Sequence, residues 1–403
     1  MLSRYMAGAV AARTGDEMSG PALLVTGLAV TGSPVLASWL LAGLTISAAV
    51  GGPLLGVLLD RSRRPGRVLA WCLSGYAGGL LLVLAGLGRV PDAALIGLAV
   101  AVGLLGPALT GGWTAQLPLV AGPERLGRAT ALDSMSYNVA GLAGPAVAGL
   151  LAAVSGGTTA LLFCTALLAA ALPAAWTLPP SPSPSPSPSP SPSPSPNGGS
   201  SGGWGWGGVR AELTAGFGVI TGNGPLRRAT AGSMVSCAGL AMLVVSAPVL
   251  GARLTGESGY GAMLLAVTAA CGLAANGVLA ARGRVRRWDA VLAWGTAVLG
   301  AGMALAAVAE AFWLAVVAAA VAGAGQGPQL TALFSVRHRH APARLRGQVF
   351  TTGASLKITS FALGSALAGP LAAYSTGVSL LAGAALQALA LVILLPRRSA
   401  SDG

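Results

Sequence analysis

Long apolar segments recur along the whole chain and are separated by short polar connections. Each has about 20 residues or more, enough to cross a bilayer core of roughly 30 Å as a helix. A backbone in lipid must satisfy its own hydrogen bonds, and segments this long do so as helices rather than as alternating barrel strands. The pattern predicts an all-α polytopic membrane protein with twelve transmembrane helices, at residues 4–28, 34–59, 68–88, 93–119, 129–154, 157–178, 226–251, 258–281, 288–309, 311–336, 345–371 and 376–396.

A Ser-Pro repeat at residues 179–201 divides these segments into two groups of six. It has no apolar residue to bury, so we expect a semi-rigid polyproline II spacer on the cytoplasmic side. The stretch "VRAELTAGFGVI" after it predicts a short interfacial helix, the alternative being an unstructured end of the linker. The expected domains are a six-helix half at 1–178, a linker with its interfacial helix at 179–225, and a second six-helix half at 226–403.

The two halves carry related motifs at nearly the same spacing. "GVLLDR" at 56–61 matches "GVLAAR" at 277–282, and both end the second helix of their half. "RLGRAT" at 125–130 resembles "RLRGQV" at 344–349, and both precede or open a fifth helix. Two pseudo-symmetric halves with a site between them are typical of an alternating-access transporter.

Composition and charge placement agree with a membrane protein. The 403 residues are 54% hydrophobic and 9% charged, and the mean hydropathy is +0.73. The net charge of +13 raises the question of nucleic-acid binding, but 20 of the 24 Lys and Arg lie on alternate connections. This positive-inside pattern predicts a multi-pass protein of the cell membrane with both termini in the cytoplasm, and it argues against a nucleic-acid partner. No cleavable signal peptide is expected.

The sequence shows no enzyme chemistry. Its four Cys residues stand singly, without metal-ligand spacing, and no nucleophile triad or phosphate loop is present. His338 and His340 fall in the basic run "SVRHRHAPARLRG", which we expect to be a solvated or lipid-facing cytoplasmic loop rather than a metal site. We therefore expect no enzymatic activity, no cofactor and no metal.

The motif "GVLLDRSRRPGR" resembles the signature of the major facilitator superfamily between helices 2 and 3, matching at Gly56, Asp60, Arg61 and Arg64. Arg63 and Pro65 depart from that signature. The first helix, "ARTGDEMSGPALLVTGLAVTGSP", is similar to the pattern of the drug- and siderophore-exporting branch that includes enterobactin and macrolide exporters. The fourth-helix Arg of many drug antiporters has no counterpart here.

Two groups of residues are candidates for gating. Asp60 at a helix end can accept hydrogen bonds from loop Arg residues or from a neighbouring helix N-terminus, which would close the cytoplasmic face in one state. The alternative is that the nearby Arg residues only set topology. The fifth helix resembles the antiporter motif at Gly144, Pro145 and Gly149, where small residues and a bend would form a seal between halves or serve ordinary packing.

Charges inside the first helix need a reason, because burying an ionised group in a membrane costs at least ~3 kcal/mol. We expect Asp16, Glu17, Arg13 and Lys357 to form one midplane cluster, in which Arg13 pairs with an acid on its own helix and Lys357 comes from the eleventh helix. One acid, Asp16 by the family pattern, would carry the coupling proton. A static cluster that sets helix packing is the alternative.

These features predict a proton-coupled exporter of a moderately hydrophobic small molecule. Uptake of a small polar solute and a non-transporting sensor or lipid-handling role remain the alternatives. Small-molecule substrate, proton and membrane lipids are the expected partners, and a monomer is the expected state. Sparse polar side chains inside the apolar helices are the candidates for substrate contact, namely Gln116, Asn138, Asn276, Gln326 and Gln329.

The spacer should act only as a tether. Replacing residues 181–196 with a Gly-Ser linker of equal length should leave transport nearly unchanged, because only the span matters for such a connector. Substrate accumulation in cells that express matched amounts of the two proteins measures this. Loss of transport at normal expression would instead indicate a partner that binds the Pro-rich strand.

Overall fold

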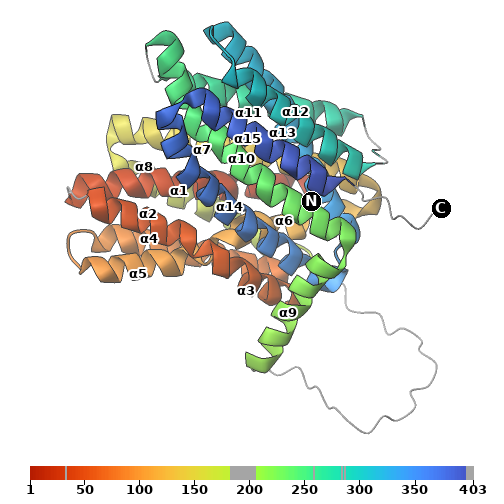
Figure 1. Ribbon diagram of the computed structural model, residues 1–403. Coiled ribbons are helices and arrows are strands. Elements are labelled where there is room, and N and C mark those ends of the chain that lie inside the picture. Colours follow the sequence, from red (N-terminus) through yellow and green to blue (C-terminus); the bar gives the residue numbers. More distant parts are fainter. Residues whose placement is uncertain (32–33, 182–205, 257–258, 283–284, 286, 396–403) are drawn as a thin grey trace, which may run out of the picture.

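The computed structural model describes residues 1–31, 34–181, 206–256, 259–282, 285 and 287–395. In this part of the chain the regular elements are helices, apart from short π and 3₁₀ turns (Figure 1). The helices of the first half are α1 (Leu2–Thr31), α2 (Pro34–Ile46), α3 (Ala48–Arg61), α4 (Pro65–Gly86), α5 (Asp92–Gly103), the π-helical turn η1 (Ala108–Gly112), α6 (Trp113–Ala115), α7 (Leu117–Ser155) and α8 (Gly157–Trp176). The later helices are α9 (Trp206–Gly222), α10 (Gly224–Thr255), α11 (Gly259–Ala281), α12 (Trp288–Ala307), α13 (Phe312–His340), η2 (Ala343–Leu345), α14 (Arg346–Tyr374) and α15 (Thr376–Leu394).

Ten helical stretches in the described residues are long and apolar enough to cross a membrane. Helices α1 and α13 are not among them. Both carry several charged side chains, including Arg13, Asp16 and Glu17 in α1 and Arg337 in α13. The all-helical membrane fold is confirmed, whereas the number of twelve spans stays a prediction.

Local sequence signals explain several helix ends. Pro65 begins α4, where its missing N–H removes no helical hydrogen bond. The Asn223 side chain caps α10 by accepting a hydrogen bond from the Leu226 N–H at 3.1 Å. Gly156 and Gly256 have φ angles of 87° and 85°, so they end α7 and α10 in backbone conformations that other residues rarely adopt.

The helices pack as two groups around separate apolar cores. One core draws its buried residues from Tyr5 to Ala175, and a second draws them from Met242 to Leu380. Between the groups, α3 packs against α14 and α7 packs against α11. The second helix of each predicted half therefore contacts the fifth helix of the other, which is the pairing that a pseudo-two-fold axis produces.

The groups touch closely at one end of the molecule and diverge at the other (Figure 1). At the closed end, Gly52 and Gly56 of α3 lie directly on α14, where a side chain would collide with Ser355, Thr351 and Gln348. Farther along α7 and α14, a side chain added at Gly149 or Gly369 would meet nothing within 4 Å. The two halves are thus in contact near the N-terminus and apart at the opposite end.

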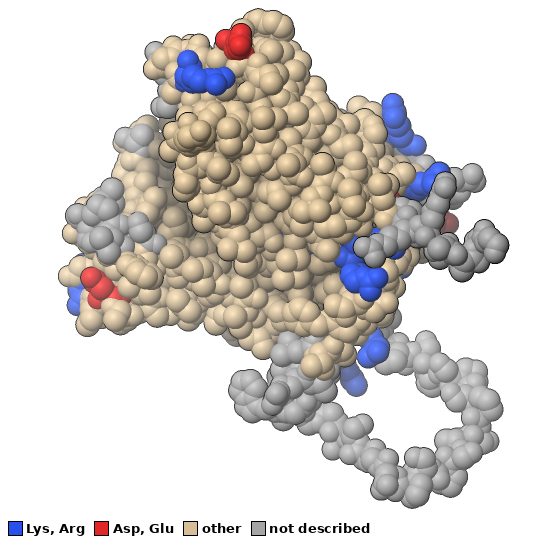
Figure 2. Space-filling model, in the orientation of Figure 1, with Lys and Arg blue, Asp and Glu red and all other residues tan. Residues whose placement is uncertain are grey.

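Basic side chains gather at the edge of the molecule near the chain termini and are sparse over the rest of the visible surface (Figure 2). Much of the remaining surface is apolar, with Trp39, Trp71, Trp294 and Trp313 each more than half exposed. Such a surface suits contact with lipid rather than with water. The predicted polyproline spacer spans residues 179–201, of which 182–201 lie outside the described residues. The helix predicted after it is present as α9, which contacts α3, α10 and α14; its place in the interface stays a prediction.

Candidate functional site: a cavity between the two halves

A cavity of about 580 Å³ lies between the two halves. Its wall comes from helices of both groups, including α1, α2, α7, α13 and α14, and from η1. The lining is mostly apolar, with Leu, Ile and Phe side chains at Leu41, Leu44, Leu240, Leu330, Phe334, Phe350, Ile358 and Phe361. Binding sites for small molecules typically have roughly 300–1,000 Å³ and a few polar groups in an apolar wall, and this cavity fits that description.

Two acids of α1, Asp16 and Glu17, line this cavity as predicted for an intramembrane charge that must face a polar space. Tyr76 of α4 lies beside the Asp16 carboxyl group, and its hydroxyl also shares a hydrogen bond of 2.9 Å with Ser19. Among the described residues, no Lys or Arg forms an ion pair with either acid. Both acids are therefore exposed to whatever enters the cavity.

Two basic side chains line the same cavity from the second half. Lys357 of α14 was predicted to lie at this level, and it does line the cavity that holds Asp16 and Glu17. It forms no ion pair with them in this structure. Arg337 of α13 lines the cavity as well. The cavity thus has acids on one wall and cations on the other.

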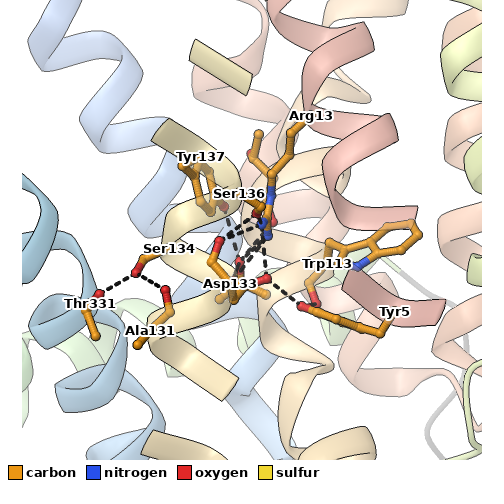
Figure 3. Close-up of polar contacts among 11 residues, drawn as sticks. Tyr5, Arg13, Trp113, Ala131, Asp133, Ser134, Ser136, Tyr137 and Thr331 are labelled. Carbon is orange, nitrogen blue, oxygen red and sulfur yellow. Dashed lines mark hydrogen bonds and ion pairs between the residues drawn. The ribbon is translucent and has the colours of Figure 1, made fainter. Parts of the chain in front are cut away.

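The predicted pairing of Arg13 with Asp16 or Glu17 is wrong, because Arg13 turns away from the cavity to Asp133 of α7 (Figure 3). Its Nη1 donates to Asp133 Oδ1 at 3.0 Å, and its Nη2 donates to Thr114 Oγ1 at 2.8 Å. The guanidinium also lies over the Tyr137 ring, 3.9 Å from the ring centre. Both charges are buried, with exposed fractions of 1% and 0%. The four-member cluster therefore does not exist in this structure.

The Asp133 carboxylate collects further donors. Tyr5 donates to Oδ1 at 2.9 Å and Thr114 donates to Oδ2 at 2.8 Å. These contacts join α1, α6 and α7 inside the first half (Figure 3). Sequence reasoning overlooked Asp133, although its signal was present, since it is an acid inside the predicted span 129–154. A buried charge pair with this many hydrogen bonds links three elements of the first half, and removing either partner would leave an unpaired buried charge.

The predicted substrate-contacting residues divide into three groups. Asn138 and Gln326 line the cavity. Gln329 lies in a small adjoining pocket, where it donates to Ser236 at 2.9 Å and Thr296 at 2.6 Å. Gln116 and Asn276 are buried away from the cavity, and Asn276 accepts a hydrogen bond from Thr331 at 2.8 Å. For these two the prediction of a cavity position is wrong, because polar side chains in a bundle also serve helix packing.

Asp60, at the end of α3, meets the first turn of α14 across the boundary between halves. Its two carboxylate oxygens accept hydrogen bonds from the backbone N–H groups of Gly347, at 2.6 Å, and Gln348, at 2.8 Å. An acid at a helix N-terminus satisfies unpaired donors and the positive end of the helix dipole. A side chain at position 347 would approach Asp60 Oδ1 to 2.7 Å, so Gly347 permits this contact.

The other members of the loop motif lie around this contact. Gly56 packs directly against α14, Arg61 is half-buried, and Arg64 is exposed just before α4. Arg346, in the first turn of α14, is within electrostatic reach of Asp60. The contact between Asp60 and α14, which we term the helix-cap latch, joins the two halves at their closed end.

The fifth-helix motif does not seal the halves here. Gly144 packs within the first half against α1, where a side chain would lie 2.6 Å from Glu17 Cβ. Pro145 is exposed, and Gly149 has open space beside it. The contacts found for this motif therefore lie within its own half.

The basic run around His338 is not a solvated loop. Helix α13 continues to His340, and His338 is buried with its ring 4.4 Å from the Phe350 ring centre. Arg337, counted among the cytoplasmic charges by the sequence pattern, is 1% exposed. Helix α13 extends beyond the predicted apolar span 311–336. A hydropathy pattern does not indicate that a helix continues through polar residues.

No cluster of three or more His, Cys, Asp or Glu suited to a metal occurs among the described residues.

Residues 5–356 match the family profile described as Major Facilitator Superfamily. A curated relative, the uncharacterised MFS-type transporter y4rN of Sinorhizobium fredii, is 32% identical over 149 residues. That match covers 37% of this chain and 37% of the relative.

Solved structures share the fold over nearly the whole chain. The human organic anion transporter MFSD10 (TETRAN) superimposes with a TM-score of 0.74 at 15% identity, covering 98% of each chain. A bacterial homologue of the iron transporter ferroportin in an outward-facing state gives 0.71 at 14% identity, covering 98% of each chain. The transporter FucP in its outward conformation gives 0.71 at 15% identity, covering 98% of this chain and 97% of FucP. At these identities the likeness concerns the fold alone.

The helix-cap latch should depend on the charge of Asp60. Asp60→Asn keeps the shape but loses one acceptor oxygen and the charge, and a hydrogen bond to a charged group is worth about 1.5–3 kcal/mol. We expect transport to be strongly reduced while the protein still inserts, as measured by substrate accumulation in cells at matched expression. Arg63→Ala, which alters an exposed side chain of the same loop, should be mild. Normal transport by Asp60→Asn would show that the latch is dispensable.

The Arg13–Asp133 pair should behave as a unit. Arg13→Met leaves Asp133 buried without its cation and should destabilise the protein by about 3–5 kcal/mol. The double variant Arg13→Met with Asp133→Leu should be closer to the wild type, because an absent pair costs less than an unpaired buried charge. Thermal unfolding of the purified proteins in detergent measures this. A double variant less stable than both single variants would contradict the pairing.

Proposed function

The chain belongs to the Major Facilitator Superfamily, and we propose that it is a proton-coupled secondary active exporter of a moderately hydrophobic small molecule, resembling the drug- and siderophore-exporting branch. It is a multi-pass membrane protein with a transporter fold. The observation that carries the proposal is the cavity between the halves, with Asp16 and Glu17 exposed to it and unpaired with any described cation. An ionisable group in this position is suited to bind and release a proton during a transport cycle.

The lining of the cavity supports a substrate with an apolar body. Leucine, isoleucine and phenylalanine supply eight of the 28 lining residues, and Asn138 and Gln326 are the only side-chain amides of that lining within the described residues. A polyhydroxylated solute needs more hydrogen-bonding partners than this wall offers, because a polar group left unpaired on binding loses affinity. Uptake of a small polar solute is therefore the less favoured alternative, and export rests on the resemblance of the first helix to the exporter branch.

The contact between the halves supports alternating access as part of this proposal. We take both termini as cytoplasmic from the placement of Arg, so we assign the closed end held by the helix-cap latch to the cytoplasmic side and the opening of the cavity to the outside. The FucP and ferroportin-homologue structures with this fold are in outward-facing states. We infer that opening toward the cytoplasm requires α14 to leave Asp60 and the small residues of α3 to separate from it.

Asp16 should couple transport to the proton gradient. We expect Asp16→Asn to abolish gradient-driven export of a panel of fluorescent amphiphiles while leaving exchange of the same compound across the membrane intact. Vesicles with an imposed pH gradient, with and without a protonophore, measure both quantities. Asp92→Asn changes an exposed acid at the start of α5 and should leave both unchanged. Export by Asp16→Asn that still collapses with the gradient would assign the proton to another group.

A further inference from the structure

Arg337 is a buried cation without a partner. It is 1% exposed, and its Nε and Nη2 have no hydrogen-bond partner. No acid among the described residues forms an ion pair with it. Burying an unpaired guanidinium is costly, so proteins normally supply it with an anion or with several acceptors. The cavity that Arg337 lines is the place from which such an anion can come.

Neighbouring residues hold the guanidinium at the cavity wall. Gly353 of α14 leaves room for it, since a side chain at that position would lie 2.5 Å from Arg337 Cζ. The Phe350 ring lies on another side, 6.0 Å from Cζ. The side chain is thus positioned by packing on α14, and its Nε and Nη2 have no hydrogen-bond partner. A planar guanidinium in this condition is suited to a two-pronged contact with a carboxylate.

Lys357 adds a second positive charge beside it. Gly353 and Lys357 are four residues apart on α14, so they lie on the same face of the helix, and Lys357 is within electrostatic reach of Arg337. Lys357 lines the cavity and also forms no ion pair with a described acid. Two like charges near each other in an apolar wall repel, and an anion between them removes that repulsion.

We propose that Arg337 and Lys357 form a binding site for the anionic group of an amphipathic organic anion, with the apolar body of that molecule lying against Phe334, Phe350 and Phe361. All five side chains line the one cavity. The inference deepens the proposed function, on which it rests only in taking this anion as the transported molecule. An anion leaving the cell would also be driven outward by an inside-negative membrane potential.

A matched pair of probes tests the site. Naphthalene-2-carboxylate and its neutral amide, naphthalene-2-carboxamide, have the same ring and differ in charge. Equilibrium dialysis against the purified protein in a neutral detergent should show that the carboxylate binds more tightly than the amide. Arg337→Gln should weaken carboxylate binding at least about tenfold, because a charged hydrogen-bond partner is lost, and should leave amide binding nearly unchanged. Lys357→Gln should also weaken binding of the carboxylate.

Arg339→Gln is the control, since it removes an exposed charge two residues along the same helix, and it should bind both probes like the wild type. If Arg337→Gln does not fold, Arg337→Lys tests the same point. This variant keeps the charge but loses the two-pronged geometry, so it should weaken binding of the carboxylate and leave binding of the amide unchanged. The proposal is overturned if the folded Arg337 variant binds the carboxylate like the wild type. It is also overturned if the wild type binds neither probe, or only the amide, up to about 1 mM.

Two further results distinguish a lipid headgroup from a free organic anion, and the anion site from the proposed transport function. Binding of short-chain dihexanoyl phosphatidate without binding of the carboxylate would identify a lipid headgroup site and overturn the proposal. Detergent binding requires no gradient, so carboxylate binding that depends on Arg337 supports the site even if the vesicle assay shows no proton-driven export. If the protein exports amphiphiles with the proton gradient but its carboxylate binding does not depend on Arg337, the anion site is overturned and the proposed function stands.

Discussion

An ionised side chain inside a membrane-spanning bundle must be paired, capped or placed in a polar cavity, and the structure uses each of these solutions once. Arg13 and Asp133 are paired inside the first half, and the Asp133 carboxylate accepts further hydrogen bonds from Tyr5 and Thr114. Asp60 is capped by the N-terminus of α14. Asp16, Glu17, Lys357 and Arg337 face the cavity between the halves. The cost of an unsatisfied charge in a low-dielectric setting decides these three arrangements.

These arrangements separate what holds a half together from what can change between states. The Arg13–Asp133 ion pair and the hydrogen bonds of Arg13 to Asp133 and Thr114 join helices of one half, so none of them would break if the halves moved relative to each other. The helix-cap latch crosses the boundary, and its parts separate only if α3 and α14 separate. The cavity charges lie on opposite walls. A rigid half with its own charge network, joined to its partner by contacts that can open, is what rocking of two halves requires.

Small residues permit the contact between halves. Gly52 and Gly56 let α3 lie on α14 at the closed end, where a side chain would collide. In lipid no hydrophobic effect draws two helices together, so close packing and polar contacts must do so. A side chain added at Gly149 or Gly369 would meet nothing within 4 Å. Small residues thus permit close helix contact at the closed end, whereas the same residue type elsewhere in the chain does not bring the helices together.

The sequence by itself determined the class of the protein, because hydropathy, segment length and the placement of Arg depend on local composition alone. The all-helical membrane fold, the superfamily and the position of Asp16, Glu17 and Lys357 at a cavity all followed from it. The sequence pattern also places Asp60 at the end of a helix. These properties need only the residue and its place along one helix.

Only the tertiary structure decided which charge meets which. Arg13 can reach Asp16 or Glu17 by helix spacing, yet it bonds to Asp133, 120 residues away in sequence. Gln116 and Asn276 are polar residues in apolar segments like Asn138 and Gln326, but helix rotation turns them away from the cavity. The sequence pattern places Arg337 in a cytoplasmic loop. In the structure Arg337 is buried, because α13 continues past its apolar segment. Partners and orientation depend on how helices distant in sequence pack, and local composition carries no information on that packing.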